Sequence, residues 1–419
     1  MTTPLPHYSF ELALNRRHDP SAGYGPEQAA VLDQAGYRLA RATISAWPGY
    51  APTPLVALPG VATAAGVASV HYKDESVRFG LGSFKALGGA YAVARLLLAQ
   101  VAARLPGTQI ELPDILAGRY REITGNITVC CATDGNHGRS VAWGAQAFGC
   151  ACVIFIHATV SEDRKNAIEH FGARVVRTDG NYDDSVRVAQ ETAEREGWFV
   201  VSDTSYEGYM EVPRDVMQGY TVMAAEAAEQ LGPTGSPSHL FLQTGVGGMA
   251  AAVVAHFWQE LGTARPATVL VDPKDSACWL ESIKAGRPTG VEGELDTIMA
   301  GLACGEISLL AWAILAPVTL AAMTVDDDAA ADCMRILADG RFGDPPLVAG
   351  ESAVAGLAGL LAVAGDTEAR RDLGLSADSR ILLFGTEGDT DPAIYEKIVG
   401  RPAAAVRESA QAAPGVGAA

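Results

Sequence analysis

Apolar residues recur at two spacings along the chain, and these predict alternating strands and helices between residues 127 and 202. Short continuous apolar runs, typical of strands buried on both faces, alternate with stretches in which apolar residues recur every three or four positions. The strands are expected at 127–133, 152–156, 174–177 and 199–202, and the helices at 138–148, 161–171 and 183–195. This order predicts a parallel sheet covered by helices.

In the N-terminal region we expect a long helix at 26–42 and a short strand at 70–75. The alternation of strands and helices returns in the C-terminal half. Strands are expected at 239–243, 268–271, 318–325 and 381–385, and helices at 213–230, 276–285, 308–315 and 326–340, with one more from Glu351. We therefore predict two parallel-sheet α/β domains. The large domain comprises 1–87 and 208–419, with 1–25 wrapping the surface and 403–419 a disordered tail, and the small domain is 88–207.

Composition excludes some classes of partner. The net charge of −18 argues against nucleic acid and anionic membranes. Pro317 interrupts the uncharged stretch 307–325, and the N-terminus resembles no secretory signal, so we expect a cytoplasmic protein that spans no membrane. The seven cysteines form no Cys-x-x-Cys pair and no histidine stands at zinc spacing beside them, so no metal is expected. Cys278 and Cys304 lie near loops, and a redox-sensitive pair there is a hypothesis.

The stretch Gly80-Leu81-Gly82-Ser83-Phe84-Lys85 leads into a helix that Ser83 is suited to cap. Lys85 then stands in the first turn, where the helix dipole and loss of solvent both favour a neutral amine. A neutral amine can form an imine with an aldehyde. A surface lysine at a helix start is the simpler alternative, because charged side chains are mostly exposed.

Two glycine-containing turns follow predicted strands. Gly245-Val246-Gly247-Gly248-Met249-Ala250 fits G-x-G-x-x-A, with Asp272 near the distance of a ribose-binding acid. The motif favours a phosphate site, because glycines let backbone amides approach an anion at a helix start. It supports a dinucleotide site less strongly, and a tight turn between a strand and a helix is the structural alternative. Thr133-Asp134-Gly135-Asn136-His137 is a second anion cradle suited to a carboxylate. There Asp134 indicates a cationic ligand group, a base, or merely a helix cap.

Polar side chains also follow two strand ends. Thr386 and Asp203 each come directly after a strand, where open α/β sheets bind ligands. Either residue alone is more often a capping residue. An imine-forming lysine, a phosphate turn, a carboxylate cradle and a hydroxyl are together what pyridoxal 5'-phosphate bound to an amino acid requires.

The sequence resembles the fold-type II pyridoxal-phosphate enzymes, the tryptophan synthase β and threonine dehydratase group, and within them most closely the diaminopropionate ammonia-lyases. The resemblance covers roughly residues 70–395. Besides the segments above, it rests on Asp74-Glu75-Ser76, Arg78-Phe79-Gly80-Leu81, Asn181-Tyr182-Asp183-Asp184, Glu207-Gly208-Tyr209, Met217-Gln218-Gly219-Tyr220, residues 298–306 and Thr386-Glu387-Gly388-Asp389-Thr390-Asp391.

The resemblance implies two α/β domains with the site in the cleft between them, and roles for individual residues. Lys85 would hold the cofactor, with Phe84 beside its ring and Asn136 on its phenolic oxygen. Gly245, Val246, Gly247, Gly248 and Met249 would hold the phosphate, and Thr386 would face an unprotonated pyridine nitrogen. Thr133 and His137 would bind the substrate carboxylate, and Asp203 the substrate amine. Lys85 and Asp134 would be two bases on opposite faces of the cofactor.

The implied reaction is elimination of the β-amine of 2,3-diaminopropionate, from either enantiomer, giving pyruvate and ammonia. The resemblance also implies a homodimer. Serine or threonine dehydration and β-replacement stay open, although Asp134 argues against them. A nicotinamide-dependent oxidoreductase would leave Lys85 and Thr386 without a role, and a ligand sensor would not need the intact set Lys85, Asp134 and Thr386.

Overall fold

The computed structural model describes residues 4–133, 135–180 and 182–412, and the chain forms two compact units. Unit 1 consists of Met1–Val31, Pro52–Ser83 and Met223–Ala419, and unit 2 of Leu32–Ala51 and Phe84–Val222. This division differs from the predicted one chiefly at 32–51. That segment belongs to unit 2 because the Trp47 ring lies 5.7 Å from Trp143 and 5.6 Å from Phe148.

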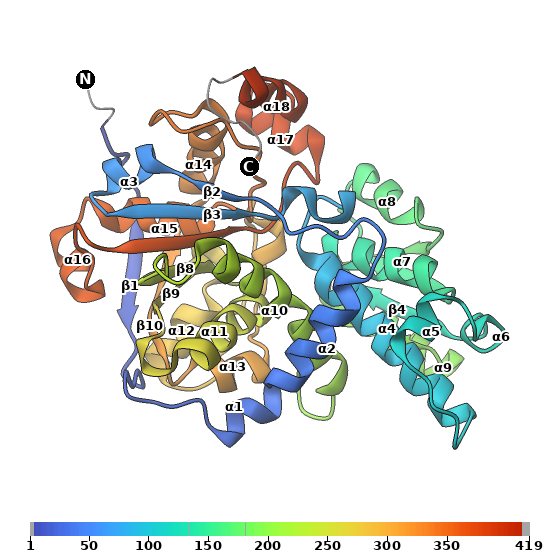
Figure 1. Ribbon diagram of the computed structural model, residues 1–419. Helices are drawn as coiled ribbons and strands as arrows, with labels where there is room; N and C mark the ends of the chain where they lie inside the picture. The colour runs from blue at the N-terminus through green and yellow to red at the C-terminus, as the bar shows by residue number, and fades with distance from the viewer. Residues whose placement is uncertain (1–3, 134, 181, 413–419) are drawn as a thin grey trace. The chain divides into compact units, whose positions relative to one another are not determined.

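Unit 1 contains a seven-stranded sheet in the order β1-β10-β9-β8-β11-β3-β2 (Figure 1). In that order the strands are Phe10–Leu14, Thr319–Val325, Ala267–Pro273, His239–Gln243, Arg380–Gly385, Ser69–Asp74 and Leu55–Ala57. The inner strands are parallel, as predicted, but β1 and β2 pair antiparallel with β10 and β3. The expectation of a wholly parallel sheet is therefore wrong at both edges, and part of 1–25 forms a strand.

The helices of unit 1 pack on this sheet or on one another. They are α1 (Pro26–Val31), α3 (Pro59–Ala65), α11 (Gly248–Leu261), α12 (Cys278–Ala285), α13 (Leu309–Leu315), α14 (Asp327–Asp339), α15 (Ala355–Ala364), α16 (Thr367–Leu373), α17 (Pro392–Val399) and α18 (Ala403–Ala412). Short 3₁₀ turns lie at η1 (Glu75–Gly80), η2 (Gly262–Ala264), η3 (Lys274–Ser276) and η4 (Ala300–Leu302). Helix α10 (Glu211–Leu231) runs through the division at Val222.

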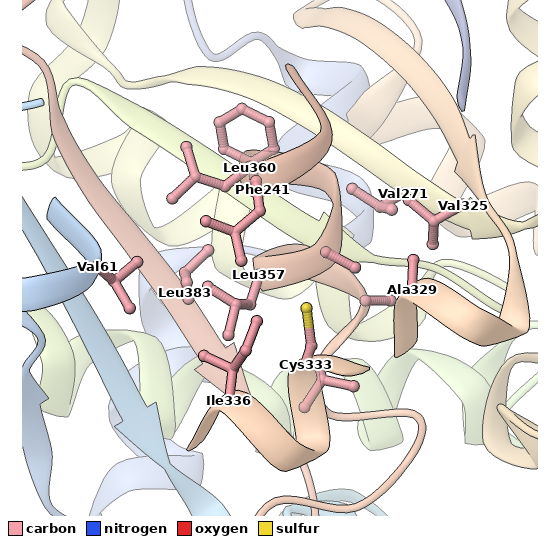
Figure 2. Packing of buried hydrophobic residues seen from close by; sticks show 14 of the residues in the cluster. Val61, Phe241, Val271, Val325, Ala329, Cys333, Ile336, Leu357, Leu360 and Leu383 are labelled. Atoms are coloured by element: carbon pink, nitrogen blue, oxygen red, sulfur yellow. The ribbon is translucent and has the colours of Figure 1, made fainter. Parts of the chain in front are cut away.

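The core of unit 1 lies between the sheet, α14 and α15. Figure 2 shows Leu357 of α15 and Ile336 of α14 among the sheet residues Phe241, Val271 and Leu383. Every residue of α15 is buried, because the helix is apolar on all sides. The sheet thus packs against a fully buried helix on this face.

Unit 2 contains a four-stranded parallel sheet in the order β6-β5-β4-β7, as predicted. Its strands are Arg174–Arg177, Ala151–Ile156, Thr128–Ala132 and Phe199–Val200. Its helices are α2 (Gln34–Ser45), α4 (Lys85–Arg104), α5 (Leu112–Leu116), α6 (Arg121–Thr124), α7 (Asn136–Phe148), α8 (Glu162–Glu169) and α9 (Tyr182–Glu196). Small residues let α4 and α7 approach closely: a Cβ on Gly144 would lie 2.7 Å from the Ala90 Cα.

Two predicted segments need correction. The helix expected at 26–42 is broken, since Asp33 accepts a hydrogen bond from the Gly36 amide and starts α2 anew. The tail expected to be disordered forms α18 as far as Ala412, anchored by the buried side chains of Ala403 and Val406. The rest of that tail lies outside the described residues.

Two further findings bear on membranes and cysteines. Among the described residues, only α4 is long and apolar enough to cross a membrane, and 61% of its apolar window is buried inside the protein. A buried core helix accounts for that composition. Cys278 and Cys304 are not joined in a disulfide.

Candidate active site

Lys85 is the first residue of α4, and its amine contacts a carboxylate of the same unit. Lys85 Nζ lies 2.5 Å from Asp203 Oδ2, with the two side chains 19% and 18% exposed. The helix starts without the expected serine cap, since Phe84 is the N-cap and no side chain caps it. Instead the Ser140 hydroxyl of α7 donates to the Lys85 carbonyl at 2.7 Å, which fixes the first turn.

Asp203 is ionised in this environment. Burial opposes ionisation, but the charges of Lys85 and then His137 hold the pKa of Asp203 well below its usual range. A carboxylate beside an amine favours the charged form of the amine, so this contact opposes the two effects that led to the prediction of a neutral Lys85. The loop that carries Asp203 is braced by Tyr209, whose hydroxyl accepts from the Ser202 amide and donates to the Val200 carbonyl.

His137 lies near the same Asp203 oxygen as Lys85. Its Nε2 is 2.8 Å from the Val201 carbonyl, which can only accept, so the network assigns the hydrogen to Nε2. Its Nδ1 is 3.8 Å from Asp203 Oδ2. The sequence-predicted residues Lys85, His137 and Asp203 are therefore brought together within unit 2.

The rest of the carboxylate cradle is only partly described. The Thr133 hydroxyl accepts from the amides of Gly135 at 3.1 Å and Gly138 at 3.3 Å, so this buried side chain shapes the turn. Asn136 opens α7 and is half-buried. Asp134, the predicted second base, lies outside the described residues.

Two aromatic rings stand beside Lys85. The Phe84 and Tyr220 ring centroids are 4.6 Å apart, and Lys85 Nζ lies 5.3 Å from the Phe84 centroid. Gly88 leaves room for Tyr220, because a Cβ there would collide with the ring. Burial raises the pKa of Tyr220 above its usual value, although the Lys85 charge opposes the shift. Tyr220 therefore stays protonated, as a neutral hydroxyl near the amine.

In unit 1 the turn from Gly245 to Met249 connects β8 to α11. Among the described residues, none accepts a hydrogen bond from the amides of Gly245, Val246 or Gly247. A Cβ on Gly245 would lie 3.0 Å from Cys304 Sγ, and Gly247 has a φ of +94°, which favours glycine. Free amides at the start of a 14-residue helix suit a phosphate group.

Thr386, after β11, is held by a residue that the sequence did not single out. Gln243, the last residue of β8, donates to Thr386 Oγ1 at 3.0 Å and to the Phe384 carbonyl at 2.7 Å. Because the threonine oxygen already accepts from the amide, its own hydrogen is directed elsewhere and suits an unprotonated ring nitrogen. The one available signal was the position of Gln243 at the strand end before the glycine turn.

Asp272 does not act as a ribose-binding acid. Its Oδ1 accepts from the Thr244 hydroxyl at 2.5 Å, and Oδ2 accepts from the amides of Trp279 at 2.8 Å and Leu280 at 3.0 Å. The residue is fully buried, and burial raises its pKa to about 7. Both oxygens are thus engaged within the protein, so the nicotinamide alternative loses its acidic residue.

Comparisons with known proteins agree with this chemistry. A family model described as "Pyridoxal-phosphate dependent enzyme" matches residues 46–385. The chain is 41% identical over 361 residues to the diaminopropionate ammonia-lyase of Salmonella typhimurium, covering 84% of this chain and 89% of that protein. It is 38% identical over 381 residues to the diaminopropionate ammonia-lyase of Escherichia coli K12, covering 90% and 94%.

Solved structures give the same result. The Escherichia coli diaminopropionate ammonia lyase in complex with an aminoacrylate-PLP azomethine reaction intermediate matches with a TM-score of 0.83 and 36% identity, over 94% of this chain and 98% of that one. A processed threonine deaminase isoform from Solanum lycopersicum matches with a TM-score of 0.68 at 20% identity, which shows a shared fold alone.

Proposed function

The chain belongs to the family of pyridoxal-phosphate-dependent enzymes, with the fold-type II architecture, and we propose that it is a diaminopropionate ammonia-lyase. The reaction is elimination of the β-amine of 2,3-diaminopropionate, followed by hydrolysis to pyruvate and a second ammonia. Its support is the pairing of Lys85 with Asp203 in a chain that closely resembles ammonia-lyases over most of its length.

The residues present fit the cofactor. The free amides of Gly245, Val246 and Gly247 would hold its phosphate. Thr386 would offer a hydrogen to its ring nitrogen, and Lys85 would supply the amine that holds it. Bound pyridoxal phosphate supplies an electron sink for the charge that develops at the substrate α-carbon. As the resemblance implies, Phe84 would pack beside the ring and Asn136 would bond its phenolic oxygen.

Asp203 exchanges partners in this proposal. In the chain alone it is paired with the Lys85 ammonium at 2.5 Å. With Lys85 holding the cofactor, the Asp203 carboxylate would be available to bind an ammonium group of the substrate, with His137 beside it. An ionised carboxylate suits a substrate that carries a second amine, which serine and threonine lack.

Proton removal is assigned to two bases. Lys85 takes the α-proton from one face and Asp134 from the other, so that both enantiomers react. Thr133 and His137 orient the substrate carboxylate. The enantiomer of the substrate thus determines whether Lys85 or Asp134 accepts the α-proton.

Pyruvate release measures the substrate directly. With equal concentrations of diaminopropionate and serine, pyruvate is expected chiefly from diaminopropionate. A preference for serine would make the protein a dehydratase and overturn the proposal.

Replacing Asp134 tests the second base. Asp134→Asn is expected to abolish reaction with one enantiomer of diaminopropionate and to retain the colour of the bound cofactor. Asp163→Asn, the same change at an exposed position of α8, is the control and should leave both rates unaltered. Equal loss with both enantiomers would show that Asp134 binds substrate instead.

Assembly and location also belong to the proposal. We expect a homodimer, as the family resemblance implies, working in the cytoplasm on a small amino-acid substrate. Sedimentation of the holoenzyme tests the first point, and fractionation of the source cells tests the second.

A further inference from the structure

Asp272 joins the residue that precedes the phosphate turn to the start of α12. Its carboxylate accepts the Thr244 hydroxyl on one oxygen and the amides of Trp279 and Leu280 on the other. A buried carboxylate is costly unless its oxygens are hydrogen-bonded. These three donors therefore make Asp272 a fixed link between the end of β8 and α12.

Trp279 in turn forms the back of the phosphate turn. Its indole Nε1 donates to the Gly245 carbonyl at 3.1 Å, which points that carbonyl away from the anion side of the turn. Its ring lies where a Cβ of Gly247 would be, so any larger residue there would collide with it. The indole is fully buried.

The far side of Trp279 is supported as well. The Trp312 ring stacks on it with centroids 6.1 Å apart and an interplanar angle of 30°, and the Arg17 guanidinium lies 5.8 Å from the Trp312 centroid. The Ser308 amide donates to the Val246 carbonyl at 2.9 Å. Two successive carbonyls of the turn are thus held by groups behind it, which leaves the amides to face a ligand.

We propose that Asp272 and Trp279 are positioning residues that set the affinity for pyridoxal phosphate through its phosphate group without touching it. Backbone amides bind an anion well only if they already point at it, since ordering them on binding costs affinity. Asp272 fixes α12, α12 fixes the indole, and the indole fixes Gly245 and Gly247. The inference rests on the proposed placement of the phosphate at Gly245–Met249.

Trp279→Phe removes the indole donor and keeps an aromatic ring. The dissociation constants of pyridoxal phosphate and of pyridoxal, which lacks the phosphate, are measured by titrating apoenzyme and following fluorescence and absorbance. Loss of one hydrogen bond predicts an increase of about 3- to 10-fold for pyridoxal phosphate. The pyridoxal constant should be unaltered, and Trp198→Phe in unit 2 should change neither.

Asp272 is tested by a pair of variants. Asp272→Asn keeps one oxygen to accept from the Trp279 and Leu280 amides, whereas Asp272→Ala keeps none. Affinity for pyridoxal phosphate should therefore fall further in Asp272→Ala and be largely rescued in Asp272→Asn. The melting temperature of each apoenzyme shows whether it is folded.

Other outcomes would overturn the proposal. Equal weakening of pyridoxal phosphate and pyridoxal, or a lower apoenzyme melting temperature without any change in affinity, would mean that Trp279 is structural only. Gly247→Ala distinguishes the placement of the phosphate at the turn from the positioning role of Trp279. If it weakens pyridoxal phosphate binding while Trp279→Phe does not, the phosphate placement stands and the positioning role fails. If neither variant weakens binding, the placement itself is wrong.

Discussion

Among the described residues, Lys73 in unit 1 and Lys85 in unit 2 each pair with a carboxylate, and the two pairs differ in how completely their charges are satisfied. In unit 1, Lys73 lies 2.8 Å from Glu226 and Arg78 lies 2.7 Å from it, with side chains at most 1% exposed. In unit 2, Lys85 lies 2.5 Å from Asp203, and about a fifth of each side chain is exposed, at 19% and 18%.

The unit 1 cluster is saturated. The Lys73 amine donates to Glu226, to the Thr53 carbonyl at 2.7 Å and to Gln230 at 2.9 Å, which uses all three of its hydrogens. Arg78 binds Glu75 at 2.8 Å as well as Glu226. The Lys73 amine therefore has no unused donor for a ligand. The cluster instead holds η1, the segment that precedes Lys85 in the chain.

The exposed fraction of the side chains distinguishes the candidate catalytic pair, Lys85 and Asp203, from the structural pair, Lys73 and Glu226. A lysine whose hydrogens are all bonded inside the protein cannot give up its amine to another molecule. Lys85 and Asp203 meet at a site that solvent reaches, so a ligand can replace either partner. The comparison yields predictions that separate loss of function from loss of stability.

Lys85→Ala should have the largest effect on activity. Removal of both the cofactor's amine partner and a base predicts a fall in pyruvate formation of about 10⁴-fold or more, with the fold retained. Activity and circular dichroism of the purified variant measure the two outcomes. Lys274→Ala, at an exposed site, is the control. A mildly impaired Lys85→Ala would refute the assignment of the amine.

Arg78→Met should have the largest effect on stability. It leaves Glu75 buried without its arginine and Glu226 with Lys73 as its remaining cation, which predicts a loss of about 3–5 kcal/mol in the free energy of unfolding, measured with urea. Arg371→Met removes an arginine that is 68% exposed and should change stability by less than about 1 kcal/mol. Similar losses in the two variants would show that burial does not distinguish these ion pairs.

Asp203→Asn should have an effect that depends on pH. Although burial alone would raise the pKa of Asp203, Lys85 and His137 depress it. The pair's contribution is therefore present above the unfolded pKa of about 3.9 and is lost as pH falls through the folded value. Urea unfolding should show a deficit of about 1–2 kcal/mol at pH 7 that shrinks below pH ~4.

The control for that series is Asp378→Asn, an exposed carboxylate whose replacement should cost little at either pH. A deficit for Asp203→Asn that is equal at both pH values would mean that it arises from packing and not from charge.

Gln243→Leu should have the smallest effect. The Thr386 hydroxyl loses the donor that orients it, which predicts a fall of about 3- to 10-fold in kcat/KM and a shift in the absorbance of the bound cofactor. Gln190→Leu, at an exposed site of α9, should change neither. An unaltered spectrum would contradict the orienting role of Gln243.

The parts of the molecule predicted from the sequence are those whose signal is local. The parallel strands and the Ser161 cap of α8, whose hydroxyl accepts from the Arg164 amide, follow from the spacing and type of neighbouring residues. β1 was missed because its alternation is limited to five residues, Phe10–Leu14, and the strand forms by pairing with β10, which is distant in sequence.

The candidate site divides in the same way. Lys85 and the glycine turn stand in recognisable local motifs. Gln243 and Arg78 acquire their roles only from partners more than a hundred residues away, Thr386 and Glu226, and no local pattern identifies such pairs. Asp272 matched a local motif, but its meaning changed once Thr244 and Trp279 were found to occupy its oxygens.

The most direct test of the central claim is to find which lysine binds the cofactor. Holoenzyme is reduced with borohydride, digested and mapped by mass spectrometry. The pyridoxyl phosphate group should be found on the peptide that contains Lys85, and the peptide that contains Lys73 should be unmodified. Modification of Lys73, or an unmodified Lys85, would contradict the account.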